Sequence, residues 1–452
     1  MGYAMIQIDI SKKLGDIRKI YLRARLNSKT SLVKAVTKKI ENHIGKQYAT
    51  NAERIAGEFL TKWFVKNGKF EEDALIEYLL SSDLERIILS FWQCVGSVWS
   101  RHAGKTFPQN VDSSMLMSQW YGAKNESLKL LENNDPNASA PVKDIIDKVN
   151  QSGSCIISMI PAGSQANRPV TDTDLSSEDH LHRVTFDLYG DIGKIYAPGK
   201  AEKDHTKGAL DILEGIFAYD TLSGGPRTWI LNAMNITVCP YCNRQYITSL
   251  TADGKDINTG DIDHFYLKNV YPYLALSVYN FIPSCQICNS RFKHTEDCFY
   301  TPHVNPHKHG FGSRARFRIP DITPYLDEDA WNNSDNLLVI EVDRRPAPPA
   351  SDEPSPEAIE NSIATFHLNE VYASHYDYAR EIVWKSRIYT DDMIDSLSEN
   401  LGSIFGSKKE IRELVYGQYL NQDEAHKRPF AKLTQDLLEE STSWVIPQKS
   451  SK

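Results

Sequence analysis

The sequence lacks a long apolar stretch of the kind that spans a membrane. Its longest uncharged run, residues 269–290, contains two prolines and several amide and hydroxyl side chains. A membrane-spanning helix needs about 20 predominantly apolar residues, so this run does not qualify. The first residues include Asp9, Lys12 and Lys13, which interrupt the hydrophobic part of a secretion signal. We therefore expect a cytoplasmic protein with no membrane-bound part.

The chain also lacks an excess of positive charge. It carries 51 Lys and Arg against 59 Asp and Glu in 452 residues, and its formal net charge is −8. This balance argues against a surface that is basic throughout, although one basic groove for nucleic acid can lie on an acidic protein. Hydrophobic residues make up 41% of the chain, which is enough to build the packed cores of about two to four domains.

Cysteine is scarce, with seven residues in the chain, but four of them form two C-x-x-C pairs. The pairs are Cys239 with Cys242 and Cys285 with Cys288. In a chain without an export signal, such pairs are typical of a zinc site rather than of disulfides. Four thiolates complete the tetrahedral coordination that Zn²⁺ prefers and leave no open position. We predict one structural zinc ion that holds the fold and takes no part in catalysis.

The segment between the two cysteine pairs predicts a compact ββα unit. Residues 261–265 alternate as a short strand does, and residues 280–284 form a second strand after a loop. Residues 288–293 begin a helix directly after the last cysteine. One zinc ion would therefore clamp this unit at both ends.

The polar residues of this unit occur in the order Asp263-His264, Asn280 and Asn289, followed by Lys293. Together with the cysteine pairs, this order resembles the motif of the HNH (ββα-metal) endonucleases in their zinc-bound, four-cysteine form. The resemblance implies that His264 is the general base that deprotonates the attacking water. It also implies that Asp263 and Asn289 hold one Mg²⁺ or Mn²⁺ ion on the scissile phosphate. Asn280 would brace the loop and orient His264 through a hydrogen bond.

The chemistry of phosphodiester hydrolysis is consistent with these residue types. A neutral imidazole can accept a proton at pH 7, and a divalent cation can stabilise the charge on the phosphate. Considered alone, His264 could instead be a structural histidine at the end of a strand. For the whole chain, the alternatives are a zinc-knuckle module that binds nucleic acid or protein without catalysis, and a nuclease that cuts RNA.

A basic segment follows the motif. Between residues 291 and 318 the chain carries six Lys or Arg against two acidic residues. We predict that this segment is a solvated loop that faces the phosphates of the substrate. Its predicted substrate-binding residues are Arg291, Lys293, Arg314, Arg316 and Arg318.

The regions on either side of the motif show apolar residues at helical spacing, over about 30–132 and 361–440. We expect an α+β fold with a mainly helical N-terminal region (1–135), a loop-rich boundary (136–182), the HNH nuclease domain (183–320) and a mainly helical C-terminal region (321–452). Further short strands are predicted at 3–10, 155–160 and 183–188.

A narrower resemblance links residues 262–285 to the HNH subunits of bacterial anti-phage defence systems, the Septu type among them. Such nucleases are typically paired with an ABC-type ATPase. The resemblance implies a gated effector that cuts DNA and binds a regulatory ATPase through its helical regions.

Overall fold

The computed structural model of the chain describes its residues in several stretches. These are residues 5–23, 30–102, 200–223, 225–253, 255–299, 301–326, 338–345, 353–402, 404–442 and 444. The predicted boundary region 136–182 and the predicted strands at 155–160 and 183–188 lie outside them. Within these stretches, no helix is long and apolar enough to cross a membrane.

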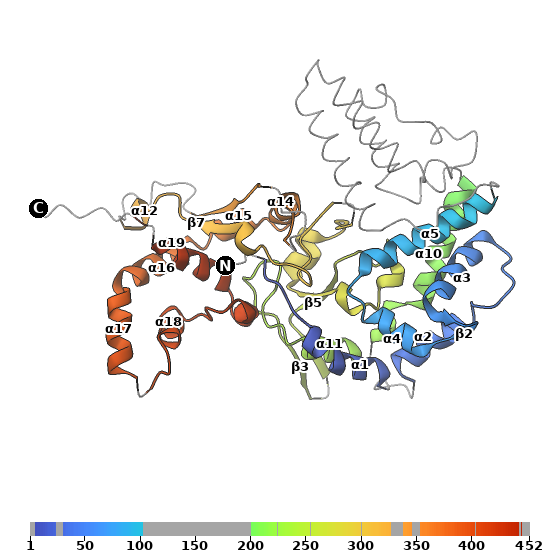
Figure 1. Cartoon of the computed structure of the whole chain (residues 1–452), viewed down its shortest axis with the longest axis horizontal. Helices are drawn as coiled ribbons and strands as arrows, with labels where there is room; N and C mark the ends of the chain where they lie inside the picture. The colour runs from blue at the N-terminus through green and yellow to red at the C-terminus, as the bar shows by residue number, and fades with distance from the viewer. Residues whose placement is uncertain are drawn as a thin grey trace, which may run out of the picture.

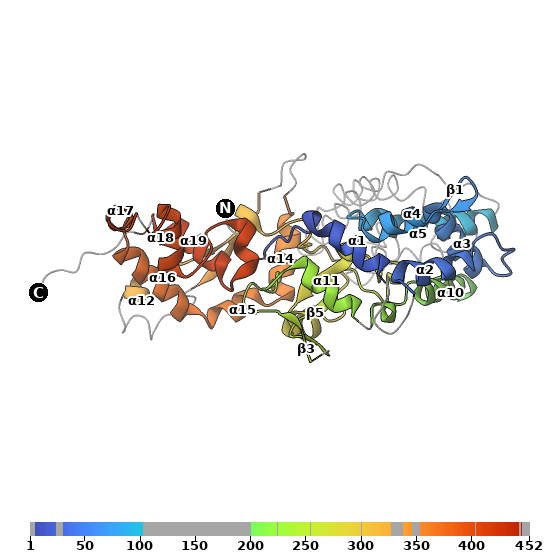
Figure 2. The same ribbon diagram turned by 90° about the horizontal axis from the view of Figure 1, so that it is seen from below.

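The fold is α+β, which confirms the predicted fold class at this level. Its described strands form four antiparallel sheets of two strands each, and helices dominate both ends of the chain. Figure 1 shows an elongated molecule with the N-terminal helices at one end and the C-terminal helices at the other. The segment that contains the cysteine pairs lies between them, and the perpendicular view in Figure 2 gives the same order.

The N-terminal end is built from helices and one small hairpin. The helices are α1 (Leu14–Leu22), α2 (Leu32–Glu41), α3 (Asn51–Phe64), α4 (Glu72–Leu79), α5 (Leu84–His102) and α10 (Lys200–Ile216), and the hairpin strands are β1 (Val65–Lys66) and β2 (Lys69–Phe70). Helix α2 starts after Ser31 and α3 after Thr50, and each of these side chains caps the first turn. Helix α10 packs along α3, so it completes the N-terminal helical layer.

The N-terminal helices share one hydrophobic core with the cysteine-containing segment. The buried hydroxyl of Tyr21 donates a hydrogen bond to the carbonyl of Leu276, at 2.7 Å. The buried hydroxyl of Tyr78 donates to the carbonyl of Tyr273, at 2.9 Å. Because a buried hydroxyl is costly without a partner, these two bonds fix how the helices sit on the loop that follows the motif histidine.

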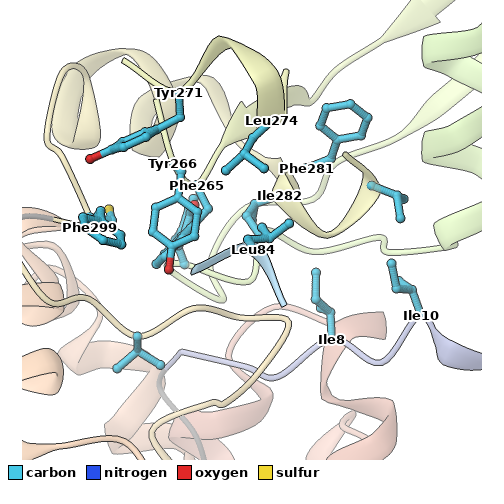
Figure 3. Packing of buried hydrophobic residues seen from close by; sticks show 14 of the residues in the cluster. Ile8, Ile10, Leu84, Phe265, Tyr266, Tyr271, Leu274, Phe281, Ile282 and Phe299 are labelled. Atoms are coloured by element: carbon cyan, nitrogen blue, oxygen red, sulfur yellow. The ribbon is translucent and has the colours of Figure 1, made fainter. Parts of the chain in front are cut away.

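Residues 6–10 run as an extended segment rather than as a strand of a sheet. The N–H of Ile6 donates to the carbonyl of Pro240, and the N–H of Ile8 donates to that of Pro306. Alternate side chains are buried, as the predicted strand at 3–10 requires, and Ile10 continues the buried row. Figure 3 shows Ile8 and Ile10 in the same cluster as Ile282. The alternation of buried and exposed side chains was therefore predicted correctly, but the segment is not a strand of a sheet as predicted for residues 3–10.

The central segment contains a short helix and two hairpins. Its elements are η4 (Tyr219–Leu222), α11 (Pro226–Met234), β3 (Ser249–Ala252), β4 (Lys255–Asn258), β5 (Asp261–His264), η5 (Pro272–Leu274), η6 (Val278–Asn280), β6 (Phe281–Ser284) and the π-helix η7 (Ile287–Lys293). Strand β5 pairs with β6 so that His264 lies opposite Phe281. The predicted order of strand, loop, strand and helix is confirmed for these residues.

The C-terminal end is again mainly helical. Its elements are η8 (Gly312–Arg314), β7 (Ala315–Arg318), α12 (Thr323–Leu326), β8 (Val339–Val342), α14 (Pro356–Thr365), α15 (Leu368–Ala373), α16 (Tyr376–Ile388), α17 (Asp391–Asn400), α18 (Lys408–Tyr416), η9 (Gln422–Lys427) and α19 (Ala431–Ser441). Strands β7 and β8 pair with each other, so the predicted domain boundary at 320/321 falls between two paired strands. Helix α19 packs on β7, and Asp436 accepts a hydrogen bond from the N–H of Phe317.

Candidate active site

The four paired cysteines meet in one buried cluster. Their sulfur atoms all lie within 4.8 Å of one another. A zinc ion with sulfur ligands at about 2.3 Å would separate those atoms by about 3.8 Å, so the cluster has the right size for a metal such as zinc. Burial raises the pKa of the Cys239 thiol well above its ordinary value, and a bound divalent cation would reverse this shift by stabilising the thiolates. Among the described residues, this is the only group of three or more His, Cys, Asp or Glu with metal-binding geometry.

The two halves of the cluster are held by different means. The N–H of Cys288 donates to the sulfur of Cys285, at the start of helix η7. The first pair is followed by Asn243, whose φ of 47° places it in the left-handed region that asparagine tolerates. The Asn243 side chain accepts from the N–H of Lys432 and donates to the carbonyl of Ala425. The first cysteine turn is therefore attached to the C-terminal helices.

His264 lies at the end of β5 and is almost fully buried, with 6% of its surface exposed. Its Nε2 lies 3.1 Å from the carbonyl oxygen of Ala275. Because a carbonyl oxygen only accepts hydrogen bonds, the ring proton sits on Nε2, and Nδ1 carries the lone pair. Burial lowers the pKa of His264 to about 4, so the ring is neutral at pH 7. A ring of this tautomer and charge is a proton acceptor at Nδ1.

Asn280 braces the loop between the two strands, as predicted. Its Oδ1 accepts from the N–H of Tyr266, at 2.8 Å, and its Nδ2 donates to the carbonyls of Tyr266 and Leu274. The predicted direct hydrogen bond to His264 is not among these contacts. Instead, Asn280 fixes the loop next to Ala275, and the carbonyl of Ala275 orients the imidazole.

Asp263 is the centre of a buried polar cluster. Its Oδ1 accepts from the Nζ of Lys293 at 3.1 Å, and its Oδ2 accepts from the hydroxyl of Tyr241 at 2.5 Å. Lys293 also donates to the backbone carbonyl of His264, at 2.8 Å. Burial acts to lower the pKa of Lys293, but the Asp263 carboxylate and its neighbours raise it above the ordinary value. Lys293 is therefore a buried, charged partner of Asp263, and its prediction as a solvated phosphate ligand is wrong.

The predicted catalytic metal ligands, Asp263 and Asn289, make hydrogen bonds to separate partners. Both carboxylate oxygens of Asp263 are occupied by hydrogen bonds. The side chain of Asn289 donates instead to the carboxylate of Asp261, at 3.1 Å. Asp261 is only partly buried. In the described structure the carboxylate that lies with Asn289 is that of Asp261, and magnesium binding by Asp263 and Asn289 stays a prediction.

The arginines of the predicted basic rim pair with acidic residues. Arg314 is buried, with its guanidinium 3.6 Å from Asp343. Arg316 lies 2.9 Å from Glu439 of α19, and Arg318 lies between two glutamates. Arg316 and Arg318 belong to strand β7 rather than to a loop, and the acidic face of α19 compensates their charge. The predicted solvated, phosphate-facing loop is therefore wrong for these three residues, whereas Arg291 is exposed as expected.

Sequence reasoning missed a group of residues around His264. The ring of Tyr219 packs edge-on against the imidazole, with the ring centroids 4.7 Å apart. Arg227 and Lys268 both lie over the ring of Tyr219. The three residues are far apart in the chain and belong to no motif, so no local pattern connects them.

Comparison with protein-family models, with curated proteins and with solved structures gives no match for this chain. The relation to HNH nucleases therefore stays a prediction from the motif residues.

The buried partnership of Asp263 predicts the effect of its removal. Asp263→Ala leaves the Lys293 ammonium buried without its counter-charge, which typically costs about 3–5 kcal/mol of stability. We expect this loss in the free energy of unfolding measured with denaturant. If the chain has the predicted nuclease activity, excess Mg²⁺ should not restore it in this variant. Asp261→Ala is the matched control, and it should cost about 1 kcal/mol or less because this carboxylate is partly exposed. A stable Asp263→Ala protein that regains activity in excess Mg²⁺ would instead place a metal ion at Asp263.

Proposed function

We propose that the chain is a metal-dependent phosphodiesterase of the HNH type that cuts DNA, with His264 as the general base. The observation that carries this proposal is the hydrogen bond from Nε2 of His264 to the carbonyl of Ala275. It makes Nδ1 the proton acceptor in a hairpin whose second strand, β6, runs directly into Cys285 of the cysteine cluster. A neutral ring at pH 7 supports the same role.

The division of labour follows from the residues present. Nδ1 of His264 accepts the proton of the attacking water, and Nε2–H stays bonded to the carbonyl of Ala275, which stabilises the imidazolium that forms. A divalent cation, when bound, supplies charge stabilisation at the phosphate. The amide oxygen of Asn289 and the carboxylate of Asp261 are oxygen donors of the kind that Mg²⁺ prefers.

A second candidate is a zinc-knuckle module that binds nucleic acid without cutting it. The burial of His264 favours this alternative, because only 6% of the residue is exposed. The buried pair of Asp263 and Lys293 also favours it, because the pair engages the carboxylate that was predicted to bind the catalytic metal ion. The active site does not distinguish DNA from RNA, so RNA is a further candidate substrate.

The proposal includes a regulatory partner, an ATPase that docks on the helical regions and gates cleavage. Support comes from the distribution of exposed apolar side chains. Of the twelve large hydrophobic side chains that are exposed in the described residues, six lie on or between α16, α17 and α18. They are Tyr376, Trp384, Ile388, Met393, Ile404 and Leu414. Where such side chains form one contiguous patch, the patch typically marks a protein–protein contact.

The nuclease and binding-module proposals predict different results in one assay. Purified protein is incubated with plasmid DNA, single-stranded DNA or total RNA, in Mg²⁺, Mn²⁺ or EDTA. We expect nicking of plasmid in the presence of either metal ion and no nicking in EDTA. Tight binding of all three substrates without cleavage, also after co-expression with the partner ATPase, would favour the binding module. Cleavage confined to RNA would reassign the substrate.

A further inference from the structure

We propose that Arg227 and Lys268, arranged on the ring of Tyr219, bind the phosphodiester group of the substrate next to His264. The inference deepens the proposed function, because it names the residues that recognise the nucleic-acid backbone at the same site. None of the three residues belongs to the motif or to the basic segment 291–318.

Two cations contact the Tyr219 ring, which itself packs against His264, the candidate general base. The ring of Tyr219 contacts the His264 imidazole at a centroid distance of 4.7 Å and an interplanar angle of 77°. The guanidinium carbon of Arg227 lies 4.7 Å from the centroid of the Tyr219 ring. The Nζ of Lys268 lies 4.5 Å from the same centroid. Lys268 also acts electrostatically on His264, so an anion bound by this lysine would lie near the imidazole.

The three side chains come from separate elements that meet at this point. Tyr219 begins the turn η4, Arg227 lies in the first turn of α11, and Lys268 lies in the loop after β5. Cation–π contacts of this kind hold a charged group in place without neutralising it. Tyr219 is partly buried and Lys268 is exposed, so the site has a side that opens to solvent.

The charges of these two cations are not compensated as those of the basic segment are. Within the part of the chain that the structure describes, neither Arg227 nor Lys268 has an acidic side chain within ion-pair distance, whereas Arg314, Arg316 and Arg318 each have at least one.

The neighbouring carboxylates do not neutralise the pair either. Asp261 and Asp220 both act on Tyr219 electrostatically, but the described hydrogen bond of Asp261 goes to Asn289, and neither carboxylate forms a described ion pair with Arg227 or Lys268. The Nε of Arg227 is buried and has no hydrogen-bond partner in the described structure. A buried, unsatisfied donor on a charged group is unfavourable, and an anionic acceptor would satisfy it.

A phosphodiester fits the chemistry of this pair. The planar guanidinium of arginine donates two parallel hydrogen bonds to phosphate oxygens, and the ammonium of lysine adds a mobile point charge. Contacts of this type fix the register of a nucleic acid on a protein without reading its sequence. The pair would hold the scissile phosphate, or one next to it, against Nδ1 of His264.

The test measures binding rather than cleavage. The dissociation constant of a fluorescein-labelled DNA duplex is determined by anisotropy with zinc-loaded protein and no added Mg²⁺ or Mn²⁺, at salt concentrations between about 50 and 200 mM. For Arg227→Gln/Lys268→Gln we expect weaker binding and a slope of log K against log salt that is smaller by about 2, since each lost phosphate contact removes about 1. The control Arg316→Gln/Arg318→Gln removes the same charge from β7 and should leave the slope unchanged. Arg227→Lys should keep most of the slope.

The outcomes separate this inference from the proposed function. The inference would be overturned if the salt slope of the Arg227/Lys268 variant were unchanged, or if both double variants lost the same amount of slope. Either result would leave the nuclease proposal intact. The expected slope change in a protein that never cleaves, also after co-expression with the partner ATPase, would support the inference and reject the nuclease. Wild-type protein that binds neither DNA nor RNA would overturn both. Melting temperature and metal content identify a misfolded variant, in which case Lys268→Gln alone should lower the slope by about 1.

Discussion

Cys288→Ser is expected to release the bound metal ion and to unfold the central segment. A serine hydroxyl is a poor zinc ligand, so the tetrahedron loses one of its four bonds. Structural zinc sites contribute an apparent free energy of about 10–16 kcal/mol, which is comparable with the whole stability of a typical domain, about 5–15 kcal/mol. Because Cys285 directly follows β6, the loss of the cluster also releases the strand that pairs with β5 and positions His264. We expect about one equivalent of zinc in the wild type and an insoluble or poorly folded variant.

The chain offers a matched control in Cys298. This thiol is also buried, with 4% of the residue exposed, but it is not a member of the four-cysteine cluster. Cys298→Ser changes the same atom, and it should keep the metal and most of the melting temperature. Elemental analysis and thermal unfolding of both variants measure the difference. A Cys288→Ser protein that is well folded, with no metal and an unchanged melting temperature, would contradict the structural role of zinc.

His264→Ala is expected to lower the cleavage rate by about 10²- to 10⁴-fold, the usual cost of removing a general base. The imidazole acts on the attacking water and not on the phosphate, so the affinity for DNA should change little. Its ring packs between Tyr219 and Phe281, so alanine leaves a cavity and some loss of stability is expected. His264→Gln fills more of this space and can donate to Ala275, yet it has no basic nitrogen. Both variants should show this loss of rate, and excess Mg²⁺ should rescue neither.

The pH dependence of cleavage gives a second check on the same residue. Burial lowers the pKa of His264 to about 4, so the neutral, basic form dominates at every pH above about 5. The rate should therefore show no inflection near 6.5, the ordinary value for histidine, and should fall only as the pH approaches 4. The measurement is the single-turnover rate at constant Mg²⁺ between pH 5 and pH 8. A rate that falls tenfold per pH unit below 6.5 would contradict a buried, neutral base.

The sequence predicts the parts of this site that depend on local pattern. The two C-x-x-C pairs predicted the cluster, and alternation predicted β5 and β6 within one residue of their ends. The helix after Cys288 was also predicted, although it is a π-helix, in which the N–H of His294 donates to the carbonyl of Asn289. Such features depend on residues that are close together in the chain, so they can be predicted from the sequence alone.

The roles of charged residues were harder to predict, because they depend on partners far away in the chain. Lys293 looks like a surface cation in the sequence, but it lies inside, against Asp263. Arg316 belongs to a basic run, but Glu439 lies opposite it in space. Conversely, Arg227 and Lys268 are isolated in the sequence and meet only on the ring of Tyr219.

The most direct test of the central claim compares the nicking of supercoiled plasmid by zinc-loaded wild-type protein and by His264→Gln, each in Mg²⁺ and in EDTA. We predict that the wild type nicks the plasmid only with Mg²⁺, and that the variant, equally folded and equally able to bind DNA, is slower by at least about 100-fold. Equal nicking rates for the two proteins would show that His264 is not the base, and the nuclease assignment at this site would be wrong.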